Sequence, residues 1–220
     1  AKMLYRSNLL LEIECDKIIN ILNEILSQAE AGEIKIEKEF EDMHSKIEYI
    51  LTDKLGDIGK KIHTARSRND QVLVSIQLYL IDELNFIKTE VKSLFDLLIN
   101  LAKKNKNIIM PGYTHMRAAM PSSFGLWFSA YAEILIDDVI SLNSTIEIIN
   151  QNTLGSAAGY GTSFNIDRDF TTNDLNFKTL KYNSLACQIS RNKIEKNTFD
   201  TLGNIAFTLS KISMDICLYS

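Results

Sequence analysis

The chain has 220 residues, of which 45% are hydrophobic and 24% are charged, a composition typical of a folded protein with a buried core. Its net charge of −4 argues against non-specific binding to nucleic acid, which depends on clustered Lys and Arg. Cys15, Cys187 and Cys217 are widely spaced and odd in number, so they predict neither a disulfide framework nor a zinc site. Without a signal-peptide pattern or an apolar run long enough to span a bilayer, we expect a cytoplasmic protein that does not bind a membrane.

Helix-breaking residues are rare in this chain. Only two prolines and nine glycines occur, and apolar residues recur at helical spacing. We expect helices over about residues 4–31, closed by Gly32, and 42–55, closed by Gly56, because glycine relieves a left-handed backbone at a helix end. Two longer helices of about 25 to 33 residues should follow, well beyond the usual globular length. The apolar positions of these two helices run from Ile76 to Leu101 and from Tyr131 to Ile149. A third long helix is expected from Glu195 to about Tyr219.

These elements predict an all-α fold. Strand patterns are nearly absent, and the apolar stripes of such long helices exceed what one small domain can cover, so we expect an oligomeric helix bundle. The loop over residues 56–68 marks the best boundary. We therefore predict part of an N-terminal helical domain over residues 1–65 and part of a long-helix bundle domain over residues 66–220.

A polar cluster precedes the first long helix. Residues 63–71 read HTARSRNDQ and lead into a helix expected to start near Asp70, whose carboxylate can cap free backbone N–H groups. A helix start favours anions, and an arginine offers a carboxylate two parallel donors. Arg66 and Arg68 can equally be ion-pair partners that tie loops together, so composition alone leaves both interpretations open.

A second cluster, MPGYTHMRAAMPSSFGLW, covers residues 110–127. Pro121 is expected in the first turn of the next helix, which leaves Thr114 and His115 on the turn between the helices. Histidine can pass protons near neutral pH, although a histidine in a loop is more often a surface residue. By the same reasoning His44 and His63 are weaker catalytic candidates.

A third cluster, TLGSAAGYGTSFNIDRD, covers residues 153–169. It lacks the Lys-Ser/Thr and the preceding strand of a phosphate loop, and no βαβ unit surrounds it. A close-packed turn is the expected structure.

Together the three clusters resemble the argininosuccinate lyases, a family within the fumarase and aspartase superfamily. The resemblance rests on HTARSRNDQV, MPGYTHMRAAMPSSFGLWFSAYAE and LGSAAGYGTSFNIDR, with EDMHSKIEYILTDKLGDIGKKIHT upstream. Their order, their spacing and the long helices between them agree with that family. The resemblance favours a functional interpretation of Asn69, Thr114 and His115.

The resemblance implies a reversible elimination that splits argininosuccinate into arginine and fumarate without a metal or an organic cofactor. By the family's pattern, Ser67, Arg68 and Asn69 form a substrate-binding stretch, with Asn69 in direct contact. Thr114 binds substrate, and His115 acts as the general acid/base or positions it. His44 also matches a histidine near the family's site, with Asp42 beside it, whereas Asp70 is expected to be a cap or to orient Arg68.

One signature of that family is absent from these residues. A mobile Gly-Ser-Ser loop followed by Met-Pro-x-Lys-x-Asn supplies its catalytic serine base, and neither motif occurs here. We therefore expect a fragment that also lacks the extreme N-terminal segment, that is inactive alone, and whose parent is a homotetramer with active sites shared by three subunits. Two alternatives stay open, namely a silent, crystallin-like structural homologue and another fumarate-releasing lyase.

Overall fold

The computed structural model describes residues 1–220, which divide into two compact units. The first unit comprises Ala1–Val74 and Gln151–Ile189, and the second comprises Ser75–Asn150 and Ser190–Ser220. The helices are α1 (Lys2–Arg6), α2 (Glu12–Glu30), α3 (Met43–Leu55), α4 (Asp57–Lys60), the 3₁₀ helix η1 (Lys61–His63), α5 (Arg68–Lys104), α6 (Phe124–Ile149), α7 (Arg168–Asp174), α8 (Ser184–Ile189) and α9 (Lys193–Tyr219). The fold is therefore helical, as predicted. The proposed domain boundary near residue 65 stays a prediction.

The first unit packs its helices around a small apolar core. Leu4, Leu10, Ile18 and Leu51 are its buried residues. The single helix predicted over residues 4–31 is wrong, because α1 ends at Arg6 and α2 begins at Glu12. Between them Asn8 takes a left-handed backbone, and the resulting turn brings Leu10 into the core beside Leu4.

Both glycines predicted to close helices do so. Gly32 and Gly56 have φ of 71° and 58°, and their N–H groups bond to the carbonyls of Ala29 and Thr52, respectively. Only glycine adopts such a backbone without strain. The rest of this unit includes a short parallel pair of strands, β3 (Gln151–Asn152) and β4 (Thr179–Leu180).

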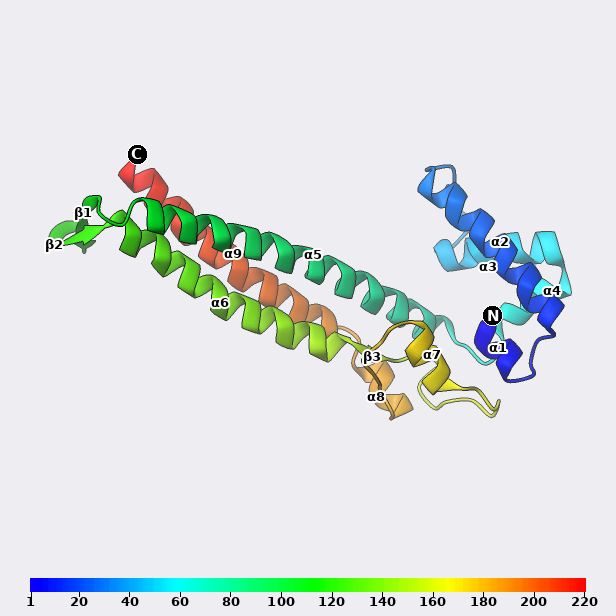
Figure 1. Cartoon of the computed structure of the whole chain (residues 1–220). Helices are drawn as coiled ribbons and strands as arrows, with labels where there is room; N and C mark the ends of the chain where they lie inside the picture. The colour runs from blue at the N-terminus through cyan, green and yellow to red at the C-terminus, as the bar shows by residue number, and fades with distance from the viewer. The chain divides into compact units, whose positions relative to one another are not determined.

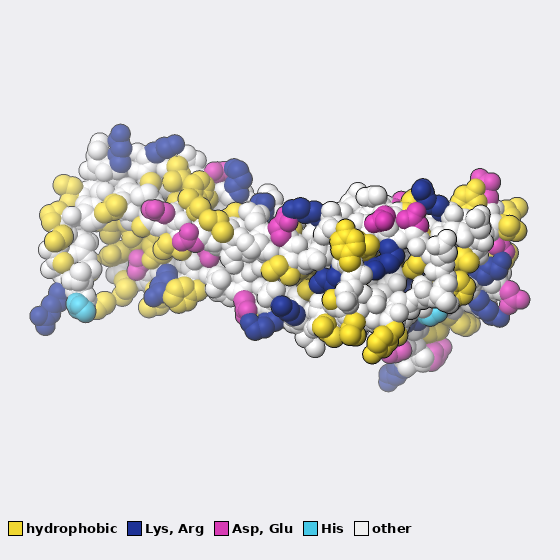
Figure 2. Space-filling model, turned by 90° about the horizontal axis from the view of Figure 1, so that it is seen from below, with side chains coloured by type: hydrophobic (Ala, Val, Ile, Leu, Met, Phe, Trp, Pro, Cys, Tyr) yellow, Lys and Arg dark blue, Asp and Glu magenta, His cyan; other side chains and the backbone are white.

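The second unit is a bundle of long helices, in which α6, α9 and the part of α5 after Val74 lie side by side (Figure 1). The 37-residue α5 exceeds the predicted length, while α6 has 26 residues and α9 has 27. Many of their inward positions are apolar, and the amide of Gln77 on α5 donates to the Ile149 carbonyl on α6. Many hydrophobic side chains nevertheless lie at the surface of this unit, at the left of Figure 2.

Residues 109–123 form an antiparallel hairpin that the sequence did not predict. Its strands are β1 (Ile109–Thr114) and β2 (Arg117–Ser123), in which Pro111 pairs with Pro121. The expected place of Pro121 in the first turn of α6 is therefore wrong. Ser123 caps α6 instead, since its Oγ accepts the Leu126 N–H, and Pro121 without an N–H fits a two-stranded ribbon that has no further neighbour.

Candidate active site

The predicted site residues fall into two groups. Ser67, Arg68 and Asn69 at the start of α5 lie in the first unit with His44 of α3, and the structure brings these four into one region. Thr114 and His115 lie in the second unit, at the end of the β hairpin, and are described separately.

The start of α5 is a well-formed helix cap. The Ser67 N–H donates to Asp70 Oδ1 at 2.9 Å, and the Asn69 N–H donates to Ser67 Oγ at 3.3 Å. Such reciprocal bonds satisfy donors that have no partner within the helix. The capping role predicted for Asp70 is confirmed, and Asp70 lies in the first turn of a helix that starts at Arg68. Asn69 stays exposed and free to meet a ligand.

The other oxygen of Asp70 holds the third sequence cluster. Asp70 Oδ2 accepts the N–H groups of Gly155 and Ala157, each at 2.9 Å. The Asp70 side chain is fully buried, and burial raises its pKa although the backbone donors and the Arg66 charge act to lower it. The small-residue turn expected at 153–169 is thus fastened to the start of α5, and Asp70 is engaged in structure rather than in orienting Arg68.

Glu48, which was not predicted from the sequence, binds the basic side chains around this cap. Glu48 of α3 accepts a hydrogen bond from Arg66 at 3.0 Å and from Arg68 at 3.1 Å, and His63 Nδ1 lies 3.0 Å from it. Partial burial raises the pKa of Glu48, but the His63 hydrogen bond and the arginine charges outweigh it and leave the pKa below its usual value. Glu48 lies one turn after His44, a spacing that could have indicated a shared helix face.

These contacts include the ion pairs that composition alone allowed. Arg68 also donates to Gln71 at 3.1 Å, and its Nε lies 3.9 Å from Asp42. Both arginines therefore form ion pairs within the first unit. Substrate binding by Arg68 stays a proposal.

His44 lies in the first turn of α3, half-buried. Burial lowers its pKa, with the charges of Arg68 and Arg66 acting in the same direction. Asp42 caps this helix by accepting the Ser45 N–H at 2.8 Å. A neutral imidazole at this place can accept as well as donate a hydrogen bond.

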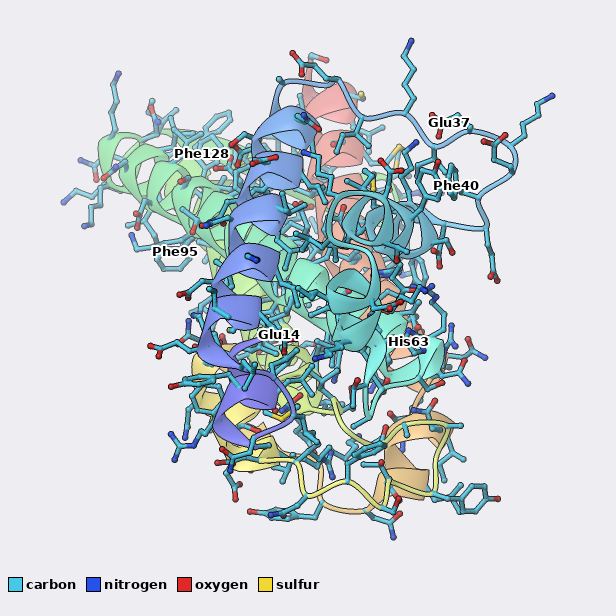
Figure 3. All side chains as sticks on the ribbon, turned by 90° about the vertical axis from the view of Figure 1, so that its right-hand side faces the viewer. Glu14, Glu37, Phe40, His63, Phe95 and Phe128 are labelled. Carbon is cyan, nitrogen blue, oxygen red and sulfur yellow. The ribbon has the colours of Figure 1, made fainter.

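The loop before α3 is held by a lysine. Lys46 Nζ bonds both carboxylate oxygens of Glu37, at 2.9 and 2.7 Å, and lies 4.7 Å from the centre of the Phe40 ring (Figure 3). Phe40 in turn packs on Tyr49. Side chains of α3 therefore hold the loop that leads into this helix.

Thr114 and His115 lie at a two-residue hairpin turn. His115 and Met116 have φ of 49° and 61°, and Thr114 pairs with Arg117 across the end of the ladder. Left-handed backbone at both central residues matches the twist of the flanking strands. His115 lies on a turn, as predicted, whereas the same prediction for Thr114 is wrong because it is the last residue of β1. Both residues are exposed.

Aromatic residues secure the helices beneath this hairpin. The Trp127 indole and the Tyr131 hydroxyl both donate to Asp215 Oδ2 of α9, at 2.9 and 2.6 Å. Burial and the adjacent carboxylate raise the pKa of Tyr131. The Tyr219 ring packs on Trp127 and lies 6.1 Å from the ring of Tyr113, which precedes Thr114.

Two further properties bear on the kind of site. No group of three or more His, Cys, Asp or Glu side chains is placed to hold a metal ion. None of the helices combines the length and the apolar character needed to cross a membrane.

Comparison with known proteins identifies the family. A family model described as "Lyase" matches residues 1–220. The argininosuccinate lyase of Phocaeicola vulgatus is 49% identical over 218 residues, which cover 99% of this chain and 49% of that relative. That of Thermotoga neapolitana is 42% identical over 220 residues, which cover all of this chain and 55% of that relative. The chain thus spans about half the length of the curated relatives it matches.

The fold agrees with this match. The crystal structure of EDDS lyase in complex with formate superposes with a TM-score of 0.90 at 24% identity, covering 99% of this chain and 42% of that chain. At this identity the likeness concerns the fold alone. Since the family model covers every residue, the chain belongs to the lyase family.

Proposed function

We propose that the protein containing these residues is an argininosuccinate lyase of arginine biosynthesis, which splits argininosuccinate into arginine and fumarate. The observation that carries the proposal is identity of 42% and 49% to two curated argininosuccinate lyases over essentially the whole chain. The capped start of α5, with Ser67, Arg68 and Asn69 beside it, supports it chemically. The helix dipole at this end favours the carboxylates that such a substrate carries.

The proposed reaction needs donors around the substrate. A proton leaves the carbon next to a carboxylate while the guanidinium departs from the neighbouring carbon, so negative charge grows on carboxylate oxygens. Asn69 and Thr114 are proposed to contact substrate directly. Arg68 and Ser67 complete the binding stretch, and His44 lies beside it.

His115 is proposed to move the proton or to position the group that does. Its exposed place on a two-residue turn leaves the imidazole accessible. As the family resemblance implies, we propose that the active site is shared between subunits of a homotetramer. The cytoplasmic location, and the inactivity of the 220-residue chain alone, stay predictions.

The test is fumarate release from argininosuccinate by the natural protein, followed by ultraviolet absorbance. His115→Asn should lower kcat by about 100-fold or more, the usual contribution of a general acid or base. Asparagine tolerates left-handed backbone better than most residues, so the turn is kept while the imidazole is lost.

The matched control is Met116→Asn, the same substitution at the next left-handed residue. It should retain activity near that of the unmodified protein. A folded protein that releases no fumarate would contradict the proposed function and favour a silent homologue or another substrate. If the His115→Asn variant keeps its activity, His115 has no role in proton transfer.

A further inference from the structure

The loop that leads into α5 contains a strained residue. Ala65 has φ of 59°, a left-handed conformation that is unfavourable for a residue with a Cβ. Such strain persists only where the surrounding structure imposes it. Ala65 lies immediately before Arg66 and four residues before Asn69, so whatever holds this turn also sets where α5 begins.

The Glu48 side chain contacts residues of the loop on both sides of Ala65. His63 Nδ1 and Arg66 Nη2 each lie 3.0 Å from Glu48 Oε1, and Arg68 Nη2 lies 3.1 Å from Oε2. One carboxylate on α3 therefore contacts residues two before, one after and three after Ala65. Its side chain is 25% exposed, so these charge pairs are less screened than pairs at the open surface.

Neighbouring carboxylates do not replace it. Asp70 directs its oxygens to the backbone N–H groups of Ser67, Gly155 and Ala157, and Asp42 reaches Arg68 only at 3.9 Å.

Arg66 depends on Glu48 in particular. The Arg66 Nε is buried without a hydrogen-bond partner, and burial lowers the Arg66 pKa. Without Glu48 this guanidinium would lose the carboxylate that it bonds, a costly loss for a largely buried charge.

We propose that Glu48 is a positioning residue, which imposes the Ala65 turn and thereby places Arg68 and Asn69 for substrate. The inference rests on the proposed function for its effect on catalysis, whereas its effect on the loop stands on these contacts alone. Glu48 does not touch substrate in this proposal. It acts through the residues at the start of α5.

The kinetic test compares Glu48→Gln with Glu24→Gln in the natural protein. Glutamine keeps the size of Glu48 and removes its charge, while Glu24 lies elsewhere in the same unit and pairs with Lys54 at 2.6 Å. Glu48→Gln should raise KM about 10-fold or more and change kcat less, because Arg68 and Asn69 hold substrate before and during the reaction. Glu24→Gln should leave both unchanged. Glu48→Asp, which keeps the charge, should recover part of the loss.

A double variant separates positioning from a general loss of structure. Asn69→Ala alone removes the proposed contact, so adding Glu48→Gln to it should lower kcat/KM by less than Glu48→Gln does by itself. If the decrease in kcat/KM of the double variant equals the combined decreases of the two single variants, the positioning role is overturned.

Hydrogen exchange gives a readout that needs no substrate. The amides of residues 64–69 should exchange faster in Glu48→Gln than in Glu24→Gln or the unmodified protein. Equal exchange in all three would overturn the inference, whatever the enzyme does. Absent fumarate release by the unmodified protein would instead contradict the proposed function, and the exchange result would still decide whether Glu48 holds the loop.

Discussion

Left-handed backbone at residues other than glycine marks both groups of candidate site residues. Ala65 precedes the start of α5, and His115 and Met116 form the hairpin turn. A residue with a Cβ is strained in this conformation, which persists only where the surrounding structure imposes it. The strain at Ala65 has a visible counterpart in the Glu48 contacts, and that at His115 is set by the pairing of β1 with β2.

Replacing Ala65 with glycine should stabilise the protein. Glycine adopts φ near 59° freely, and the strain relieved exceeds the added flexibility of the unfolded chain. We expect the free energy of unfolding to rise by up to about 1 kcal/mol, measured by urea denaturation.

The same substitution at Ala130 is the matched control. Ala130 is exposed in the interior of α6, where glycine should lower the free energy of unfolding by about 1 kcal/mol. Opposite signs at the two positions are the expected result. A loss of stability at Ala65 similar to that at Ala130 would show that the turn carries no strain.

At the scale of elements, the contact between α6 and α9 depends on buried polar pairs as well as on apolar side chains. Thr208 Oγ1 of α9 donates to Asp138 Oδ2 of α6 at 2.7 Å, with both residues buried. Thr145 and Thr201 are bonded across the same pair of helices, also at 2.7 Å. Such bonds contribute modestly when formed, but a buried carboxylate that loses its donor is costly.

Thr208→Val tests this pair with little change of shape. The valine fills the same space without a hydroxyl, so we expect the free energy of unfolding to fall by about 1–3 kcal/mol. Thr208→Ser keeps the donor and loses one methyl group, and should cost about 1 kcal/mol or less. If the two variants were equally stable, the hydrogen bond to Asp138 would not be what holds the helices here.

The long helices were predictable because their signal is local. Regular apolar spacing over many turns predicts a helix whatever it packs against, and Gly32 and Gly56 end helices by their own backbone freedom. The break at Asn8 was not predictable, since it depends on burying Leu10 beside Leu4. The hairpin over residues 109–123 was missed for a similar reason, because strand pairing is decided by the partner strand rather than by the segment itself.

The candidate site was predictable only in part. Motifs pointed to Ser67, Arg68 and Asn69, and a helix cap can be read from adjacent residues. Glu48 could not be assigned to the cations it binds, since 18 residues separate it from Arg66 and 20 from Arg68. The bonds from Gly155 and Ala157 to Asp70 span 85 and 87 residues and require the folded first unit.

At the scale of the whole molecule, the second unit exposes more apolar surface than a lone bundle should. Phe199 and Phe207 of α9 are 71% and 64% exposed and lie eight residues apart, on one face of the helix. Exposed apolar side chains that gather on one face commonly mark an interaction surface, whereas single exposed apolar residues are normal on any protein. We expect this face to contact another subunit of the homotetramer proposed above.

Phe207→Glu in the natural protein tests that contact. Placing a carboxylate in an apolar interface removes buried area and imposes a desolvation cost, so the tetramer should dissociate at higher protein concentration than the unmodified protein. Sedimentation velocity over a range of concentrations measures the change. Ser27→Glu adds the same charge at an exposed position of α2 and should leave assembly unaltered. If Phe207→Glu sediments as the unmodified protein does at every concentration, this face of α9 lies outside the interface.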